Sequence, residues 1–201
     1  MSKIRNRYWN SINYFGLCYL AFNSQKKKKM PDNNEIKGNY YIIADHLRTT
    51  IFALADGAKF EPKGRGYILK KLVKKATLLA YLLNLNSEHL QKISEKLIEV
   101  NSSYYQHLKE KQSLIISELK KEIDKIMNFI SVSVRELDNR YSSKITVEEI
   151  FFLYDTKGIP QELIKFYLEN KQHQFPEKEF NVLLEKQREK GRKDRGKIPV
   201  F

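Results

Sequence analysis

The segment from Ala58 to Ala76 places positive charge beside glycines, a combination that suits binding of a phosphate backbone. It contains seven basic side chains and only one acid, Glu61. The glycines in or next to it are Gly57, Gly64 and Gly66. Glycine lets a backbone approach a ligand closely, and the start of a helix presents unpaired N–H groups and a positive dipole end to an anion. The pattern leaves an alternative open: the lysines are simply the solvent-exposed side of an amphipathic helix.

The elements that position these residues are predicted to be helices. In residues 41–55, apolar side chains recur at spacings of three and four, and Gly57 supplies the stop signal. From Arg65 to Leu83, apolar residues that include Ile68 share one arc at about 100° per residue. The opposite arc carries Lys70, Lys71, Lys74 and Lys75.

Helical patterns continue through the rest of the chain. Ser87 can cap a helix that runs to about Val100, and a narrow apolar stripe predicts one long helix over residues 104–137. Thr146 and Glu149 have the spacing of a capping box, so the next helix should begin at Val147. Further helices are expected from Pro160 and Pro176 onward, followed by a basic C-terminal tail. The sequence therefore predicts an all-α helical bundle.

Composition agrees with a polyanionic partner. The chain has 201 residues, which is enough for one domain with a hydrophobic core. Its net charge of +13 would attract nucleic acid or an acidic membrane. The single cysteine, Cys18, excludes an intramolecular disulfide and a cysteine-based zinc site, so we expect a cytoplasmic protein.

Residues 1–39 form an aromatic and basic N-terminal segment with a linker, ahead of the helical domain over residues 40–201. The aromatic run, residues 8–22, has basic flanks but is shorter than the ~20 residues that span a bilayer. No membrane partner is therefore expected. The aromatic run is interpreted either as a strand or helix that packs on that domain or as a segment from a longer protein. The stretches 26–29 and 31–38 are polar and rich in turn formers, which predicts a solvated linker.

Two stretches are specific enough to indicate a family. IADHLRTTIFALADG (residues 43–57) is followed seven residues later by RGYILKKLVKKA (residues 65–76), and FFLYDTKGIPQELI occupies residues 151–164. They resemble the alanyl-tRNA synthetase family, whose patterns read IADHxR, FxIADG, RGYVLRRxxRRA and LYDTYGFPxxLT. The resemblance runs from about Tyr40 to near Arg195, with the same order and spacing.

The resemblance implies the helical domain that follows the class II catalytic core and binds the acceptor stem of alanine tRNA. In this family the loop before RGY and the aspartate of LYDT approach the third base pair, a G·U wobble, across the wide minor groove of A-form RNA. Asp155 occupies the aspartate position and could accept a bond from the 2-amino group of guanine. A local bond to Thr156 or nearby loop amides is the alternative. The predicted tRNA-binding residues are Lys63, Gly64, Arg65, Lys70, Lys71, Lys74, Lys75, Asp155 and Lys157.

Three departures from the family pattern affect specificity. The family has an asparagine immediately before RGY where this chain has Gly64, so half of the expected base-pair readout is missing. Either Lys63 or a backbone group substitutes for that amide, or discrimination is relaxed. Lys157 replaces the family's tyrosine and is a candidate for a further phosphate contact without base information. Lysines at 70, 71, 74 and 75 replace arginines, which keeps the charge but loses bidentate geometry.

The sequence offers no catalytic residues. Class II signature motifs are missing from residues 1–39, and the four histidines have no HxxxH spacing. Asp45 and His46 are adjacent on a helix and point about 100° apart, which favours a structural role. We therefore expect no metal site and no cofactor in this chain, ATP and Mg²⁺ belonging to the parent enzyme, and no activation of alanine by the chain alone.

Three interpretations remain open. The chain is a fragment or split subunit of an alanine–tRNA ligase that acts with a separate catalytic domain, a stand-alone RNA-binding module derived from the synthetase, or a truncated and nonfunctional gene product. A neighbouring gene with the catalytic motifs would favour the first interpretation.

Overall fold

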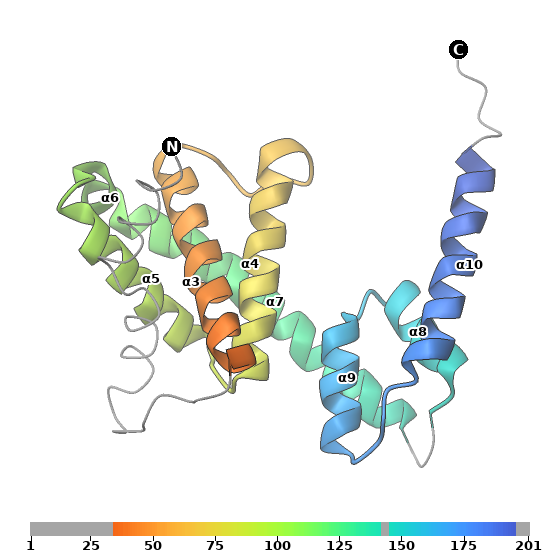
Figure 1. Cartoon of the computed structure of the whole chain (residues 1–201). Coiled ribbons are helices and arrows are strands. Elements are labelled where there is room, and N and C mark those ends of the chain that lie inside the picture. The colour runs from red at the N-terminus through yellow and green to blue at the C-terminus, as the bar shows by residue number, and fades with distance from the viewer. Residues whose placement is uncertain (1–33, 142–144, 196–201) are drawn as a thin grey trace. The chain divides into compact units, whose positions relative to one another are not determined.

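The computed structural model describes residues 34–141 and 145–195, and every regular element within these ranges is a helix (Figure 1). The helices are α3 (Asn34–Ala55), α4 (Gly64–Leu82), α5 (Ser87–Ser102), α6 (Gln106–Glu110), α7 (Gln112–Arg140), α8 (Val147–Asp155), α9 (Gln161–Asn170) and α10 (Glu177–Arg195). The prediction of an all-α fold is confirmed. The chain divides into two compact units between Phe129 and Ile130, within α7. Unit 1 is the part up to Phe129, and unit 2 is the part from Ile130 onward.

Helix α3 begins earlier than the sequence pattern indicated. Its first residue is Asn34, so the predicted linker over residues 31–38 is wrong for Asn34–Gly38. Ile36 packs against the core, which gives this polar stretch an apolar anchor and lets the helix extend. The predicted boundary between residues 39 and 40 therefore falls inside α3. The aromatic run and Cys18 lie outside the described residues.

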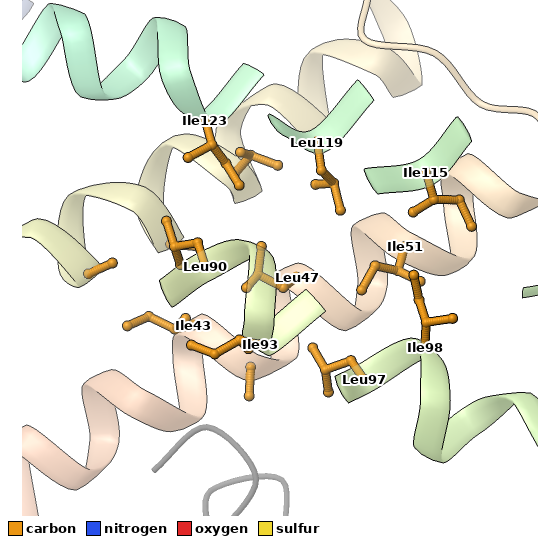
Figure 2. Packing of buried hydrophobic residues seen from close by; sticks show 14 of the residues in the cluster. Ile43, Leu47, Ile51, Leu90, Ile93, Leu97, Ile98, Ile115, Leu119 and Ile123 are labelled. Carbon is orange, nitrogen blue, oxygen red and sulfur yellow. The ribbon is translucent and has the colours of Figure 1, made fainter. Parts of the chain in front are cut away.

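The core of unit 1 forms between side chains of α3, α4, α5 and α7 (Figure 2). Helix α3 packs against α4 and α5, and α7 adds a third row of side chains. The side chains labelled in Figure 2 are Ile43, Leu47, Ile51, Leu90, Ile93, Leu97, Ile98, Ile115, Leu119 and Ile123, and all are buried. Each such side chain contributes about 1.5–3 kcal/mol through burial, which fixes the rotation of α3, α5 and α7 about their axes.

The predicted single helix over residues 104–137 is two helices. The short α6 ends at Glu110 and α7 begins at Gln112, with Lys111 between them. The Nζ of Lys111 donates a 2.6 Å hydrogen bond to the carbonyl of Ala55 at the end of α3. This tertiary bond satisfies an end-of-helix carbonyl that has no partner within α3. The apolar periodicity does not show this bond or the break between α6 and α7.

The cap of α5 also differs from the prediction. Asn86, not Ser87, is the N-cap of α5. Its side-chain oxygen accepts a 3.1 Å hydrogen bond from the backbone N–H of His89, and its backbone N–H donates to Nδ1 of His89 at 3.2 Å. The Ser87 hydroxyl instead donates to Asp124 on α7. Asparagine is at least as good an N-cap as serine, and either residue would have suited the sequence pattern.

Unit 2 follows the predicted signals closely. The Thr146 side chain accepts from the Glu149 amide at 3.3 Å and the Glu149 carboxylate accepts from the Thr146 amide at 2.8 Å, so the capping box that starts α8 is confirmed. Pro160 is the N-cap of α9. Helix α8 packs against α10, where Phe180 is fully buried and its ring centroid lies 5.4 Å from that of Tyr154.

Within the described ranges, no helix is both long and apolar enough to cross a bilayer.

Candidate nucleic-acid interface

The glycine turn after α3 is a helix-ending motif. Gly57 has a φ of +90°, and its amide donates to the carbonyl of Leu54 at 3.0 Å. The next amide, of Ala58, reaches back to the carbonyl of Ala53 at 2.9 Å. This pair of bonds is the Schellman arrangement, in which a left-handed residue reverses the chain. The prediction that Gly57 ends the helix is confirmed.

Gly66 has a different role from the one the sequence suggested. It is buried, and a Cβ built there would lie 2.4 Å from the carbonyl oxygen of Lys59 and 2.5 Å from the amide nitrogen of Glu61. The backbone that approaches Gly66 is therefore the chain's own loop, and the prediction that this glycine admits a ligand is wrong. Close packing at Gly66 instead fixes the basic loop of residues 58–63 on the first turn of α4.

Helix α4 presents its cations opposite a buried apolar side. Leu69, Val73 and Ala76 are buried, which confirms the predicted amphipathic pattern. The predicted cations of this segment are Lys63, Arg65, Lys70, Lys71, Lys74 and Lys75, which we call the α4 basic surface. Four of them, Lys63, Arg65, Lys71 and Lys74, are exposed, whereas Lys70 and Lys75 are half-buried. Ile68 is wrongly placed by the prediction, because its side chain is 58% exposed.

Two of these lysines lie over aromatic rings. The Nζ of Lys71 is 4.6 Å from the ring centroid of Tyr67, one helical turn earlier. The Nζ of Lys74 is 5.4 Å from the ring centroid of Phe129, which belongs to the same unit. Cation–π contacts at exposed sites are worth about 0.5–1 kcal/mol, enough to restrict an ammonium group without neutralising it. Both charges therefore remain available to an anion.

Gly64 occupies a left-handed position with open space around it. Its φ is +61°, and a Cβ built there meets nothing within 4 Å. Asparagine is among the few side chains that adopt this conformation readily. The site can therefore hold either glycine or the asparagine of the alanyl-tRNA synthetase pattern without a change of fold.

Asp155 is the last residue of α8 and is exposed. Its Oδ1 accepts a hydrogen bond from the side-chain amide of Gln187 on α10. The alternatives considered from sequence were Thr156 and the neighbouring amides, and nothing in the sequence pattern pointed to a residue 32 positions later. A carboxylate at the C-terminal end of a helix opposes the dipole by about 0.3–1 kcal/mol, a cost that the bond from Gln187 offsets.

Lys157 has an acidic neighbour that the sequence did not reveal. Its Nζ lies 3.5 Å from Oε1 of Glu136 on α7. The pKa of Glu136 is lowered, chiefly by the hydrogen bond from Arg140 at 2.9 Å and further by the positive charge of Lys157. Glu136 therefore stays ionised and partly neutralises Lys157, which weakens the case for Lys157 as a phosphate contact.

Asp45 and His46 are neighbours on α3 and make no hydrogen bond to each other. His46 Nδ1 lies 3.7 Å from Asp45 Oδ2, too far for a hydrogen bond, and Arg48 Nη2 lies 3.6 Å from the other carboxylate oxygen. In the part of the chain that the structure describes, no three His, Cys, Asp or Glu side chains are grouped in a way that could hold a metal ion.

The predicted site residues thus form two groups. Seven of the nine lie on the loop and first three turns of α4, in unit 1, and Asp155 and Lys157 lie at the α8–α9 turn, in unit 2. Sequence reasoning missed Gln187 and Glu136, which act only through tertiary contacts. It also left out Tyr67, although an aromatic among lysines is itself a usable signal for nucleic-acid binding.

Comparison with known proteins identifies the family. The family model described as tRNA synthetases class II (A) matches residues 3–199. The chain belongs to the class II alanyl-tRNA synthetase family. The match includes residues 3–39, for which the motifs show no counterpart.

Three alanine–tRNA ligases are among the relatives to which this chain is similar. The protein of Clostridioides difficile is 35% identical over 164 residues, covering 78% of this chain and 19% of its own length. Those of Fervidobacterium nodosum and Bacillus velezensis are 33% and 32% identical, each covering 78% of this chain and 18% and 19% of their own lengths. The chain therefore spans about a fifth of the curated relatives that it matches.

Proposed function

We propose that this chain binds the acceptor stem of alanine tRNA as part of an alanine–tRNA ligase. The observation that carries the proposal is the α4 basic surface, which lies within the region that matches the family and is held by a loop closed over Gly66. Ammonium groups bind phosphate as point charges, so this surface would give affinity and position without reading sequence.

Asp155 is proposed to supply the sequence-dependent contact to the G·U pair. One oxygen accepts from Gln187, and a carboxylate has about four acceptor positions, so capacity remains for the 2-amino group of guanine. That amino group is the feature that distinguishes guanine in the minor groove. With glycine at position 64 in place of the family's asparagine, discrimination rests on Asp155 and is expected to be relaxed.

Activation of alanine is proposed to belong to a separate catalytic domain, joined covalently or acting in trans. This chain would contribute RNA binding, with no ATP or Mg²⁺ of its own, in the cytoplasm where tRNA is charged. A stand-alone RNA-binding module remains the second candidate.

A titration with an acceptor-stem minihelix tests the proposal. Wild-type chain is compared with Lys71→Gln/Lys74→Gln, and with Lys120→Gln/Lys121→Gln as a control that removes the same charge from exposed positions on α7. We expect affinity to fall steeply with salt, and the first variant to reduce the slope of log K against log salt by about 1–2. Equal slopes for both variants would contradict the role of α4.

The same assay tests Asp155. Asp155→Ala is expected to reduce the preference for a G·U over a G·C stem by about 1–3 kcal/mol, whereas Glu169→Ala removes an exposed carboxylate from the same unit and should leave the preference unchanged. Equal loss for both stems would remove Asp155 from base readout. Adding a separately expressed catalytic domain should strengthen binding, and no change would favour the stand-alone module.

A further inference from the structure

Two large apolar side chains interrupt the α4 basic surface. Tyr67 is 46% exposed and Ile68 is 58% exposed, directly after the buried Gly66. Neither is needed to make the apolar side of α4, which Leu69 and Val73 already form. Exposed aromatic rings beside cations are the combination with which proteins bind unpaired nucleotides, because every base offers a π-face for stacking.

The ring of Tyr67 is coupled to a charge. Lys71 Nζ lies over it at 4.6 Å from the centroid, and residues separated by four positions are neighbours on a helix. A base that stacks on this face of the ring would displace the ammonium group of Lys71, which would then be free to pair with the phosphate of the same nucleotide. Stacking and charge neutralisation would occur at one place, which is the arrangement that favours RNA over an uncharged apolar partner.

The ring is also held on a rigid support. The backbone of Lys59 and Glu61 packs closely against Gly66, because a Cβ built at Gly66 would lie 2.4–2.7 Å from atoms of these two residues. The buried side chains of Leu69 and Val73 fix the rotation of α4, so that Tyr67 remains at the surface. Tyrosine has only two side-chain torsions and loses little conformational entropy when it is used as a contact.

We propose that Tyr67, with Ile68 and Lys71, is a stacking site for one unpaired nucleobase adjoining the bound RNA stem. This inference rests on the proposed function, since the stem is held by the cations around it. The base must be unpaired because bases inside a duplex stack on one another and hide their faces. The site thus makes the chain prefer a stem with a single-stranded extension to a blunt stem.

The test uses the whole chain and two RNA probes, a blunt minihelix and the same minihelix with a four-nucleotide 3′ extension carrying 2-aminopurine. The variants are Tyr67→Ala and Tyr67→Phe, with Tyr104→Ala as the control because Tyr104 is 81% exposed, lies in the same unit and is not on α4. Circular dichroism establishes that each variant keeps its helices.

We expect Tyr67→Ala to weaken binding of the extended probe by about 5- to 100-fold and to leave the blunt probe within 2-fold. Tyr67→Phe and Tyr104→Ala should behave as wild type, and stacking should quench the 2-aminopurine fluorescence in all proteins except Tyr67→Ala. Equal effects of Tyr67→Ala on the two probes would overturn the proposal, as would an unchanged affinity for the extended probe.

The two proposals fail differently. If the blunt stem binds and responds to Lys71→Gln/Lys74→Gln while Tyr67→Ala has no effect on the extended probe, the stacking site alone is refuted. If the blunt stem does not bind, or binds Lys71→Gln/Lys74→Gln as tightly as wild type, the proposed stem-binding function is refuted, and the stacking site, which rests on it, is refuted with it.

Discussion

Substituting Gly66 with alanine tests whether the basic loop is built on that glycine. The added Cβ would lie 2.4 Å from Lys59 O, 2.5 Å from Glu61 N and 2.7 Å from Glu61 Cβ. Ordinary contacts begin near 3.4 Å, so the loop backbone must move by about 1 Å or the helix start must shift. Overpacking of this kind costs about 1–3 kcal/mol. We expect Gly66→Ala to lower the free energy of unfolding by that amount.

Gly38→Ala is the matched control. Gly38 lies on α3 of the same unit, and a Cβ built there meets nothing within 4 Å. Replacing a helical glycine by alanine gains about 0.5–1 kcal/mol, so this variant should be more stable than wild type. The two substitutions are therefore expected to change the free energy of unfolding in opposite directions, although both replace glycine by alanine.

The assay is urea unfolding followed by circular dichroism, combined with minihelix titration of both variants. Because the chain has two compact units, the transition should be checked for more than one step before a single free energy is assigned. Gly66→Ala should also weaken minihelix binding, since the loop carries Lys63 and precedes Arg65. If Gly66→Ala proved as stable as Gly38→Ala and bound equally well, the close packing of the loop on α4 would be refuted.

Three further predictions concern charge, conformation and pH. Gly64→Asn should fold like wild type and raise the G·U over G·C preference by about 1–3 kcal/mol, whereas Gly64→Ala should be strained by about 1 kcal/mol and gain no preference; both are read by minihelix titration. Glu136→Gln removes the carboxylate beside Lys157, so RNA affinity should rise, and an unchanged affinity would exclude Lys157 as a contact. Burial and the 2.6 Å bond to Asp138 raise the pKa of Tyr167, so the neutral phenol stabilises the fold below pH ~10, and this stabilisation is lost as pH rises through the raised pKa. Tyr167→Phe should lower the free energy of unfolding by about 0.5–1.5 kcal/mol at neutral pH. In urea unfolding at alkaline pH, the same variant should show a smaller decrease of that free energy with pH than wild type.

Local signals in the sequence predicted the fold well where one segment contains all the determinants. The capping box of Thr146 and Glu149 fixed the start of α8, and Gly57 fixed the end of α3. The apolar periodicity of α4 placed Leu69 and Val73 in the core. These features depend on spacings of three or four residues, which sequence shows directly.

The errors arose where a tertiary contact decided the outcome. The break at Lys111 comes with a bond to Ala55, which is 56 positions away. Ile36 is one apolar residue in a polar stretch, so its periodicity is too weak to predict the first turns of α3. The prediction that Gly66 admits a ligand is wrong because the sequence around a glycine does not show which backbone packs against it.

The candidate site shows the same division. The motifs located the α4 basic surface and Asp155, and the family match confirmed the resemblance on which that location depends. The partners of those residues, Gln187 for Asp155 and Glu136 for Lys157, come from helices that only the fold brings near. The sequence therefore predicts which residues carry charge at the site, but not which residues bond to them.

The most direct test of the account is hydroxyl-radical footprinting of full-length alanine tRNA bound to the chain. The account predicts protection of backbone sugars in the acceptor stem, reduced in Lys71→Gln/Lys74→Gln and unchanged in Lys120→Gln/Lys121→Gln. Protection confined to other parts of the tRNA, or a footprint equally weakened by both variants, would contradict it.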